Sequence, residues 1–507
     1  MARDVIVAAD IGTTGVKVTL VTADGEVVAR GSGSYTTGSM ISGSHVEQHP
    51  EEWWEATVAA VRSVLEDRHR PIALALTGQM QDVVLLRGDD VLRPAVLYSD
   101  TRAQTEAESI HARLGPGVWE RTTANEQDAS SIPAKLLWLR LHEPDVVDQA
   151  DRLLLGAHSY VAWRACGEAV CDPTTASTTG LFDFEAGDWF AAAMEVAETS
   201  PALLPGLHEP YETLGALRVE AAAELGCPAG IPVVHGPGDA SATSLGAGTG
   251  AVGDSFVYLG TSGWVATVTA GERADPGTGI FTLRHVEPGQ TLKIGAMVSV
   301  GANLAWARQE LLGDVPWSRV DELAAGHGPT GLIYLPYPAG ERSPFRDPSA
   351  RAGFLGIGSD TTQADLIRAV MEGIAYSLRN IERTMTPDAK GTLVVGGGGC
   401  RSDVWCEILA AVLGRPLERI GDLEDVGALG AAVTAARALA WSSADWKLGL
   451  RTPSDRFEPD PDEVASYRPL AELHARVQPQ IRDLTRDLHH IRQFLRESDE
   501  PTDEGEP

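Results

Sequence analysis

The sequence predicts an α/β fold of two related domains that face each other across a central cleft. The 507 residues exceed one ordinary domain, and two domains of about 250 residues each are the natural expectation. One phrase occurs twice, half a chain apart: a β-type run, a Gly-Thr-[Thr/Ser]-Gly turn and a returning β-type run, at residues 7–18 and 256–265. An apolar content of 43% supports large cores, and 53 Gly with 30 Pro fit a turn-rich enzyme.

The elements of the first half alternate between strands and helices. A meander of three strands opens it (5–9, 16–22 and 26–30), and Pro50 then begins a helix with acidic residues in its first turn. The later expected elements are, in chain order, strands at 71–77 and 92–97, helices at 101–114, 133–141 and 158–166, a loop or short strand over 172–190, and a strand at 233–235.

The second half is expected to repeat this plan after a domain boundary near 246–252. It comprises, in chain order, a meander over 253–270, a helix at 302–312, a strand at 332–336, a long helix at 363–384, a strand at 392–395 and helices at 402–413 and 462–496. The predicted organisation is a first domain over 1–248, a second over 249–445, a helical segment over 446–496 and an acidic disordered tail over 497–507.

Composition excludes several classes of partner. A formal net charge of −30 argues against nucleic acid or an anionic membrane surface, because both would be repelled. The five cysteines are odd in number and have no CxxC spacing, so we expect reduced thiols. The chain opens directly on a strand, and no run approaches 18 apolar residues, so we expect a soluble cytoplasmic protein. An assembly of two copies is compatible with these features.

The repeated turns are candidate phosphate sites. Each turn, Gly12–Gly15 and Gly260–Gly263, gathers backbone N–H groups and two hydroxyls at a hairpin tip, a donor surface suited to phosphate oxygens. Only the first copy carries a carboxylate, Asp10, where the second has Tyr258. A carboxylate beside a phosphate site requires a divalent cation between them, and Mg²⁺ takes one or two carboxylates. The alternative for Asp10 is an ordinary turn-forming Asp.

A glycine run and an isolated aspartate are further candidates. Gly396–Gly399 departs from the GxGxxG pattern, so it is either a tight βα turn or a place where an adenine-ribose group approaches the backbone. Asp239 stands at a strand end between Gly238 and Ala240. It is either a helix N-cap or a general base that accepts a proton from a substrate hydroxyl, as phosphoryl transfer to an alcohol requires.

Polar side chains also follow two strands that we expect to lie side by side. They are Gln79, Gln81, Asp82, Asp100 and Arg102. Amides and carboxylates suit a polyhydroxylated ligand, because each sugar hydroxyl both donates and accepts a hydrogen bond. The alternative is loop capping together with a surface ion pair between Asp100 and Arg102.

Taken together, these motifs resemble the FGGY carbohydrate kinases, from about residue 4 to residue 440, and within that family they look most like the xylulokinases. The motifs are, in chain order, Asp10-Ile-Gly-Thr-Thr-Gly, Gly78-Gln-Met, Tyr98-Ser-Asp-Thr-Arg102, Pro133-Ala-Lys-Leu-Leu-Trp138, Gly236-Pro-Gly-Asp239, Leu259-Gly-Thr-Ser-Gly263, Gly340-Glu-Arg-Ser-Pro344, Gly397-Gly-Gly-Cys-Arg-Ser402 and Ala428-Leu-Gly-Ala-Ala432. The departures fall in the sugar pocket, where Gln81 stands in place of the usual His and Ser99 in place of the usual Asn.

The resemblance implies two actin-like ATPase (ribonuclease H-like) domains, with ATP in the cleft and sugar bound by the first domain. It implies Asp239 as catalytic base and Asp10 as the residue of the Mg²⁺-ATP site. The implied phosphate and nucleotide contacts are Gly12, Thr13, Thr14, Gly260, Thr261, Gly301, Gly398, Gly399 and Asp403. The implied sugar contacts are Gln79, Met80, Gln81, Asp100 and Arg102.

The resulting hypothesis is ATP-dependent phosphorylation of a terminal hydroxyl of a small sugar, with D-xylulose as the first candidate. A polyol such as erythritol or ribitol, another pentulose, or gluconate is the alternative substrate, which the altered Gln81 and Ser99 motivate. A non-catalytic sugar or nucleotide sensor on the same scaffold is the alternative function. Retention of both Asp10 and Asp239 argues against it.

Overall fold

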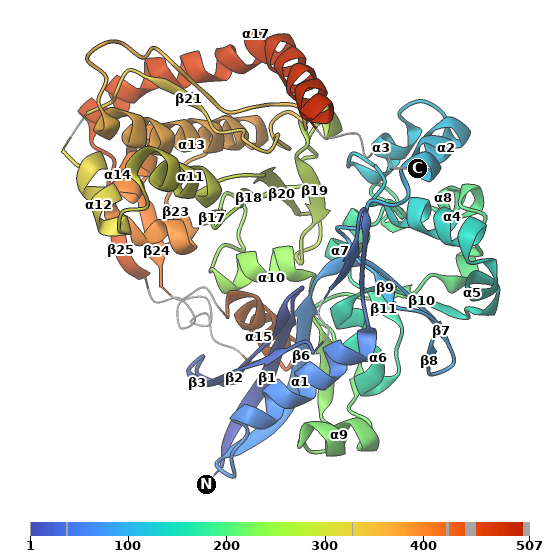
Figure 1. Cartoon of the computed structure of the whole chain (residues 1–507). Helices are drawn as coiled ribbons and strands as arrows, with labels where there is room; N and C mark the ends of the chain where they lie inside the picture. The colour runs from blue at the N-terminus through green and yellow to red at the C-terminus, as the bar shows by residue number, and fades with distance from the viewer. Residues whose placement is uncertain (1, 37–38, 327, 422–424, 442–452, 500–507) are drawn as a thin grey trace, which may run out of the picture.

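The computed structural model describes residues 2–36, 39–326, 328–421, 425–441 and 453–499. A twisted sheet forms the centre of the first domain, in the order β15-β16-β6-β1-β2-β3 (Figure 1). β1 pairs antiparallel with β2 and parallel with β6, and β16 extends the parallel part. The strands are β1 (Arg3–Ile11), β2 (Gly15–Thr22), β3 (Val27–Ser34), β6 (His69–Gly78), β15 (Gly215–Ala216) and β16 (Pro232–His235).

The second domain repeats this arrangement. Its sheet has the order β19-β20-β18-β17-β23-β24-β25, with β17 antiparallel to β18 and parallel to β23. The strands are β17 (Ser255–Leu259), β18 (Gly263–Thr269), β19 (Phe281–Arg284), β20 (Thr291–Met297), β23 (Leu393–Gly396), β24 (Leu417–Ile420) and β25 (Pro453–Phe457). Five strands of each sheet therefore follow the same order, and the predicted fold of two related α/β domains is confirmed.

Helices cover both faces of each sheet and make five layers. α1 (Pro50–Val64) and α6 (Ala157–Cys166) pack on the outer face of the first sheet. α13 (Gln363–Met385) and α14 (Asp403–Leu413) pack on the outer face of the second sheet. The middle layer between the sheets consists of α10 (Asp239–Gly246) and α15 (Val426–Ala438) (Figure 1).

α15 covers the first sheet although it comes late in the chain. Its Ala428, Ala431 and Ala435 pack against Ile6 and Ala8 of β1. It also crosses α10 with backbone against backbone: a Cβ at Gly246 would lie 1.9 Å from the Val426 carbonyl oxygen, closer than any side chain tolerates. The small residues of α10 thus serve helix packing.

A second lobe of the first domain is built on an antiparallel sheet in the order β10-β7-β9-β5-β4. Its elements and their neighbours are β4 (Met40–Ser42), β5 (His45–Gln48), β7 (Met80–Arg87), β8 (Asp90–Val91), β9 (Ala95–Val96), α2 (Gln104–Leu114), α3 (Val118–Thr123), α4 (Ile132–His142), α5 (Pro144–Gln149), β10 (Arg152–Gly156), β11 (Val170–Cys171), α7 (Pro173–Thr178), β12 (Phe182–Asp183), β13 (Asp188–Trp189), α8 (Ala191–Val196), β14 (Gly206–Leu207) and α9 (Val219–Leu225). The remaining elements of the second domain are α11 (Gly301–Leu312), α12 (Trp317–Ala324), β21 (Ile333–Leu335), β22 (Gly353–Leu355) and α17 (Pro461–Asp499).

Five sequence-based expectations need correction. The stretch after Gly78 is a strand, β7, because the chain passes from one sheet to the other with only Gln79 between β6 and β7. The predicted strand at 92–97 is reduced to β9. The stretch 172–190, predicted as a loop or short strand, begins with α7 and then contains the short strands β12 and β13. The predicted helical segment 446–496 contains a strand, β25, at the edge of the second sheet. The predicted tail loses 497–499 to α17, and residues 500–507 lie outside the described residues.

None of the described helices is both long enough and apolar enough to cross a membrane.

Candidate active site

Two side chains bind the carbonyl groups of the turn between β1 and β2 and so hold the turn in place. Tyr35 donates from its hydroxyl to the Gly12 carbonyl, and Gln48 donates from Nε2 to the Thr13 carbonyl at 2.7 Å. Gly12 N–H closes the turn on the Gly15 carbonyl at 3.0 Å. The exposed Thr14 stands at the tip. The anchored carbonyls therefore leave the outer side of the turn to donor groups, as a phosphate site requires.

The turn between β17 and β18 is backed by the start of α11. The Thr261 carbonyl accepts hydrogen bonds from the N–H groups of Val300 and Ala302, and Gly301 N–H donates to the Gly260 carbonyl at 2.8 Å. A Cβ at Gly301 would lie 2.7 Å from that carbonyl oxygen. Gly301 is therefore required for close packing behind the second turn, and its N–H is already used.

Asp239 is the first residue of α10, and Gly238 occupies the N-cap position. The alternative that Asp239 caps the helix is therefore wrong. Burial raises the pKa of Asp239 to about 7, with a further contribution from the negative charge of Asp10. Burial also raises the pKa of Asp10 to about 6, against the attraction of Lys17. The two predicted catalytic carboxylates thus share one low-dielectric site, where burial disfavours the ionised form of both.

Asp10 lines a cavity of about 230 Å³ between the two sheets, together with Lys17, Thr243, Phe256, Tyr258, Trp264, Val426 and Gly427. The start of α15 fits tightly over the carboxylate: a Cβ at Gly427 would lie 2.2 Å from Asp10 Oδ2. A half-buried carboxylate at a cavity, with a second carboxylate nearby and both pKa values raised, is a donor set that fits Mg²⁺.

The predicted sugar contacts lie at the start of β7. Gln79 is buried and donates from Nε2 to Gln48 Oε1 at 3.2 Å, which links it to the first turn. Met80 packs against Gly238, next to Asp239. Gln81 has a positive φ of 65°, donates from Nε2 to the Ser130 carbonyl at 3.1 Å, and lines a cavity of about 290 Å³.

That cavity lies between the two domains. It is lined by Gln81, Tyr98, Ser99, Thr101, Glu126, Gln127, Asp128, Ser130, Ser131 and Thr178 from the first domain and by Gly279, Ile280, Phe281, Arg342 and Arg346 from the second. Arg346 forms ion pairs with Asp128 and Glu126 across it. The two domains therefore close this cavity jointly.

Asp100 and Arg102 do not line this cavity. Asp100 is fully buried, accepts from Val46 N–H and forms a two-pronged ion pair with Arg102. Arg102 also pairs with Glu47. Asp100 and Arg102 hold the loop over 98–102 in place. Three other residues of this loop, Tyr98, Ser99 and Thr101, line the cavity.

The glycine run after β23 offers one open backbone position. Gly397 has a φ of +107° and lies against the Leu259 carbonyl, whereas a Cβ at Gly398 would meet no atom within 4 Å. Gly399 packs on Trp405. Asp403 is exposed and forms an ion pair with Arg419 at 2.8 Å. Gly398 is thus the member of the run that leaves room for a ligand.

Sequence reasoning named Asp82 only as one of the polar side chains after a strand, and it missed the other buried polar groups around Asp82 and Asp239. Asp82 is fully buried, and burial raises its pKa to about 7. Lys135 is equally buried, donates to the Leu97 carbonyl, and has a pKa lowered by burial to about 8. His158, Asp172 and His235 form a second buried group. The Asp-Pro pair at 172–173, a common helix start, was the signal available for Asp172.

Comparison with known proteins gives consistent matches. Residues 5–246 match the N-terminal domain, and residues 256–439 the C-terminal domain, of the FGGY family of carbohydrate kinases. The xylulose kinase of Escherichia coli K12 is 33% identical over 93% of this chain and 98% of its own, and that of Streptomyces rubiginosus is 32% identical over 85% and 87%. The crystal structure of xylulose kinase from Rhodospirillum rubrum matches with a TM-score of 0.87 at 29% identity, covering 95% of this chain and 99% of its own.

Proposed function

Since this chain belongs to the FGGY family of carbohydrate kinases and is an ATP-dependent sugar kinase, we propose that it phosphorylates the terminal hydroxyl of D-xylulose. The product is D-xylulose 5-phosphate. The observation that carries the proposal is the juxtaposition of Asp239 and Asp10, two carboxylates with raised pKa values, beside the repeated turns. The choice of D-xylulose follows from the relatives named above.

In the proposed mechanism Asp239 is the general base. Its carboxylate accepts the proton of the terminal sugar hydroxyl as that oxygen attacks the γ-phosphorus of ATP. The bond between the γ-phosphorus and its bridging oxygen breaks, and ADP leaves. A pKa near 7 suits this role, because a substantial fraction of such a base is ionised near neutral pH and the ionised form accepts a proton readily.

The two turns hold the phosphates of ATP from opposite domains. The amides and hydroxyls of Thr13, Thr14 and Thr261 donate to phosphate oxygens, and Gly398 lets the nucleoside approach the backbone. Asp10 would hold Mg²⁺, which neutralises phosphate charge when bound. Gln81 and the surrounding cavity orient the sugar, and the contacts of Arg346 with the first domain exclude water that would otherwise accept the phosphoryl group.

A coupled assay of ADP release over a panel of pentuloses, polyols and aldonates tests the proposal. We expect sugar-stimulated turnover that is strongest with D-xylulose and that depends on Mg²⁺. Stronger turnover with erythritol, ribitol or gluconate would reject D-xylulose as substrate. No sugar-stimulated turnover with any member would reject catalysis.

We also propose that the kinase acts in the cytoplasm as a homodimer. The exposed Leu484, Leu488 and Ile491 of α17 follow the four-and-three spacing of a helical seam. In a parallel pair of such helices, Asp487 of one copy faces Arg492 of the other, because these flanking positions are five residues apart. Sedimentation equilibrium of the wild type and of Leu488→Asp tests this, and a monomeric wild type contradicts it.

A further inference from the structure

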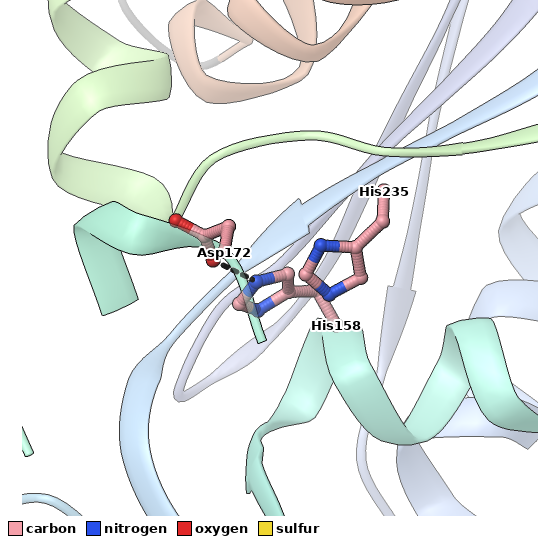
Figure 2. Close-up of side chains that lie close together, drawn as sticks. All are labelled: His158, Asp172 and His235. Carbon is pink, nitrogen blue, oxygen red and sulfur yellow. Dashed lines mark hydrogen bonds and ion pairs between the residues drawn. The ribbon is translucent and has the colours of Figure 1, made fainter. Parts of the chain in front are cut away.

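A buried group of three polar side chains lies directly behind the catalytic helix. His158 comes from α6, Asp172 precedes α7, and His235 ends β16 (Figure 2). All three are fully buried. The His158 and His235 rings lie 4.5 Å apart, and His235 Nε2 is hydrogen-bonded to Ser159 Oγ at 3.1 Å. The roles proposed above for the two turns and for Asp239 do not involve this group.

Asp172 joins three separate pieces of backbone and side chain. Its Oδ1 accepts from Thr175 N–H at 3.0 Å, which caps α7, and from Gly238 N–H at 3.1 Å. Its Oδ2 accepts from His158 Nε2 at 3.2 Å (Figure 2). Gly238 is the N-cap residue of α10, immediately before Asp239. The carboxylate therefore fixes the peptide group one residue before the proposed base.

Packing fixes Gly238 from the other side. A Cβ at this position would lie 2.1 Å from Met80 Sδ and 2.7 Å from Thr175 Oγ1. Gly238 is thus confined between β7, α7 and the Asp172 carboxylate, with no room to move toward the first two. If Asp172 no longer accepts the hydrogen bond from Gly238 N–H, this peptide group can move toward residue 172, and the direction of the Asp239 side chain changes with it.

The three side chains could in principle hold a metal ion, since their ligand atoms lie within 4.8 Å of one another. Their hydrogen bonds argue against it. Both Asp172 oxygens already accept from N–H donors, and His235 Nε2 is bonded to Ser159, so among the ligand atoms only Nδ1 of each histidine has no hydrogen-bond partner. The adjacent His158 also lowers the pKa of Asp172 well below its usual range, so the carboxylate is ionised without a metal.

We propose that Asp172, oriented by His158, is a positioning residue that aims the Asp239 carboxylate at the attacking sugar hydroxyl through its hydrogen bond to Gly238 N–H. The inference rests on the proposed function. It adds a requirement to the proposed roles of the turns and the base: the backbone before the base is held by a buried side-chain acceptor. A displacement of about 1 Å at a reacting group can cost about a hundredfold in rate.

Two substitutions separate positioning from helix capping. In Asp172→Asn the amide oxygen still accepts from both N–H groups, and His158 accommodates the new NH₂ by changing tautomer. In Asp172→Ser the shorter hydroxyl still caps α7 at Thr175 N–H, because Ser is a good N-cap, but it is too short to hold Gly238 N–H or His158. The melting temperature, kcat, and KM for sugar and for ATP are measured for both.

We expect Asp172→Asn to retain kcat within about threefold and Asp172→Ser to lose about 10- to 100-fold in kcat, with both KM values within about twofold. A Ser variant as active as the Asn variant would overturn the inference, and so would a rise in KM at unchanged kcat. A stoichiometric bound metal other than Mg²⁺ that is present in the wild type and absent from the Ser variant would overturn it as well.

A second variant applies if the Ser variant does not fold. His158→Phe removes the donor to Oδ2 and leaves both amide bonds of Asp172, so we expect a smaller loss of about three- to tenfold in kcat at unchanged KM. Unchanged kcat in that variant would overturn the inference. Wild-type turnover and its loss in Asp239→Asn test the proposed function separately, so the two failures are distinguishable.

Discussion

Replacing Asp239 with Asn should make the enzyme more stable and nearly inactive at the same time. Burial and the charge of Asp10 raise the pKa of Asp239 from 3.8 to about 7, a shift of about three units, and each unit corresponds to about 1.4 kcal/mol. The ionised carboxylate therefore destabilises the folded protein by up to about 4 kcal/mol above pH 7. We expect about half of this, roughly 2 kcal/mol, to be recovered, because the amide of Asn must also be desolvated.

The direction of the pH dependence follows from the raised pKa. The folded state binds the proton more tightly than the unfolded state, so the penalty is absent below about pH 4, grows between pH 4 and pH 7, and is complete above pH 7. For about 2 kcal/mol in domains of this size, the melting temperature should rise by roughly 4 to 8 °C at pH 8. At pH 5 the variant and the wild type should melt within a few degrees of each other.

Differential scanning fluorimetry at pH 5 and pH 8 measures the stability, and ADP release measures kcat. The loss of a general base should lower kcat by about 10² to 10⁴, with the KM for ATP unchanged. Asp360→Asn, at an exposed carboxylate, is the control in which neither quantity should change. An equal or lower melting temperature for Asp239→Asn at pH 8 would refute the electrostatic argument, and a kcat within tenfold of the wild type would refute the base.

Three further predictions use the same assays. The value of kcat/KM for the sugar should rise with pH up to about 7, because Asp239 must be ionised; a flat profile from pH 5 to 8 contradicts this. Gly427→Ala should raise the Mg²⁺ concentration needed for half-maximal activity at least fivefold, because the new methyl group displaces Asp10, whereas Gly421→Ala, where a Cβ meets nothing, should not. Arg346→Gln should raise the KM for the sugar about two- to fivefold, because an exposed ion pair is worth about 1 kcal/mol or less. The effect should shrink at high salt, which screens such pairs. A salt-independent change would point to direct sugar binding.

The phosphate turns and the carboxylates were predictable because their chemistry is local in sequence. Gly12–Gly15 and Gly260–Gly263 each place a strand, a turn and a strand within a dozen residues, and the β1–β2 and β17–β18 hairpins follow directly. Asp239 was marked by its glycine neighbours at a strand end. The structure adds that it begins α10 instead of capping it.

The groups that support the site depend on contacts between distant residues and carried little local signal. Asp172 meets Gly238 66 positions later, and nothing in the Thr-rich stretch 172–190 identifies that contact. The predicted surface pair of Asp100 and Arg102 is buried because Val46 and Glu47 come from a separate strand to meet it. The strand β7 was hidden because the glycine and amides at 78–81 resemble a loop, whereas the chain simply changes sheets there.

The position of α15 has a consequence for the synthesis of the protein on the ribosome. This helix covers the face of the first sheet that carries Ile6 and Ala8, yet it begins at Val426, 180 residues after α10 ends at Gly246. At a synthesis rate of about 5 to 20 residues per second, that apolar face stays uncovered for roughly 10 to 35 s. The first domain cannot finish folding before the second has almost been made. A fragment of residues 1–248 should therefore aggregate, and co-expression of residues 249–507 should rescue its solubility.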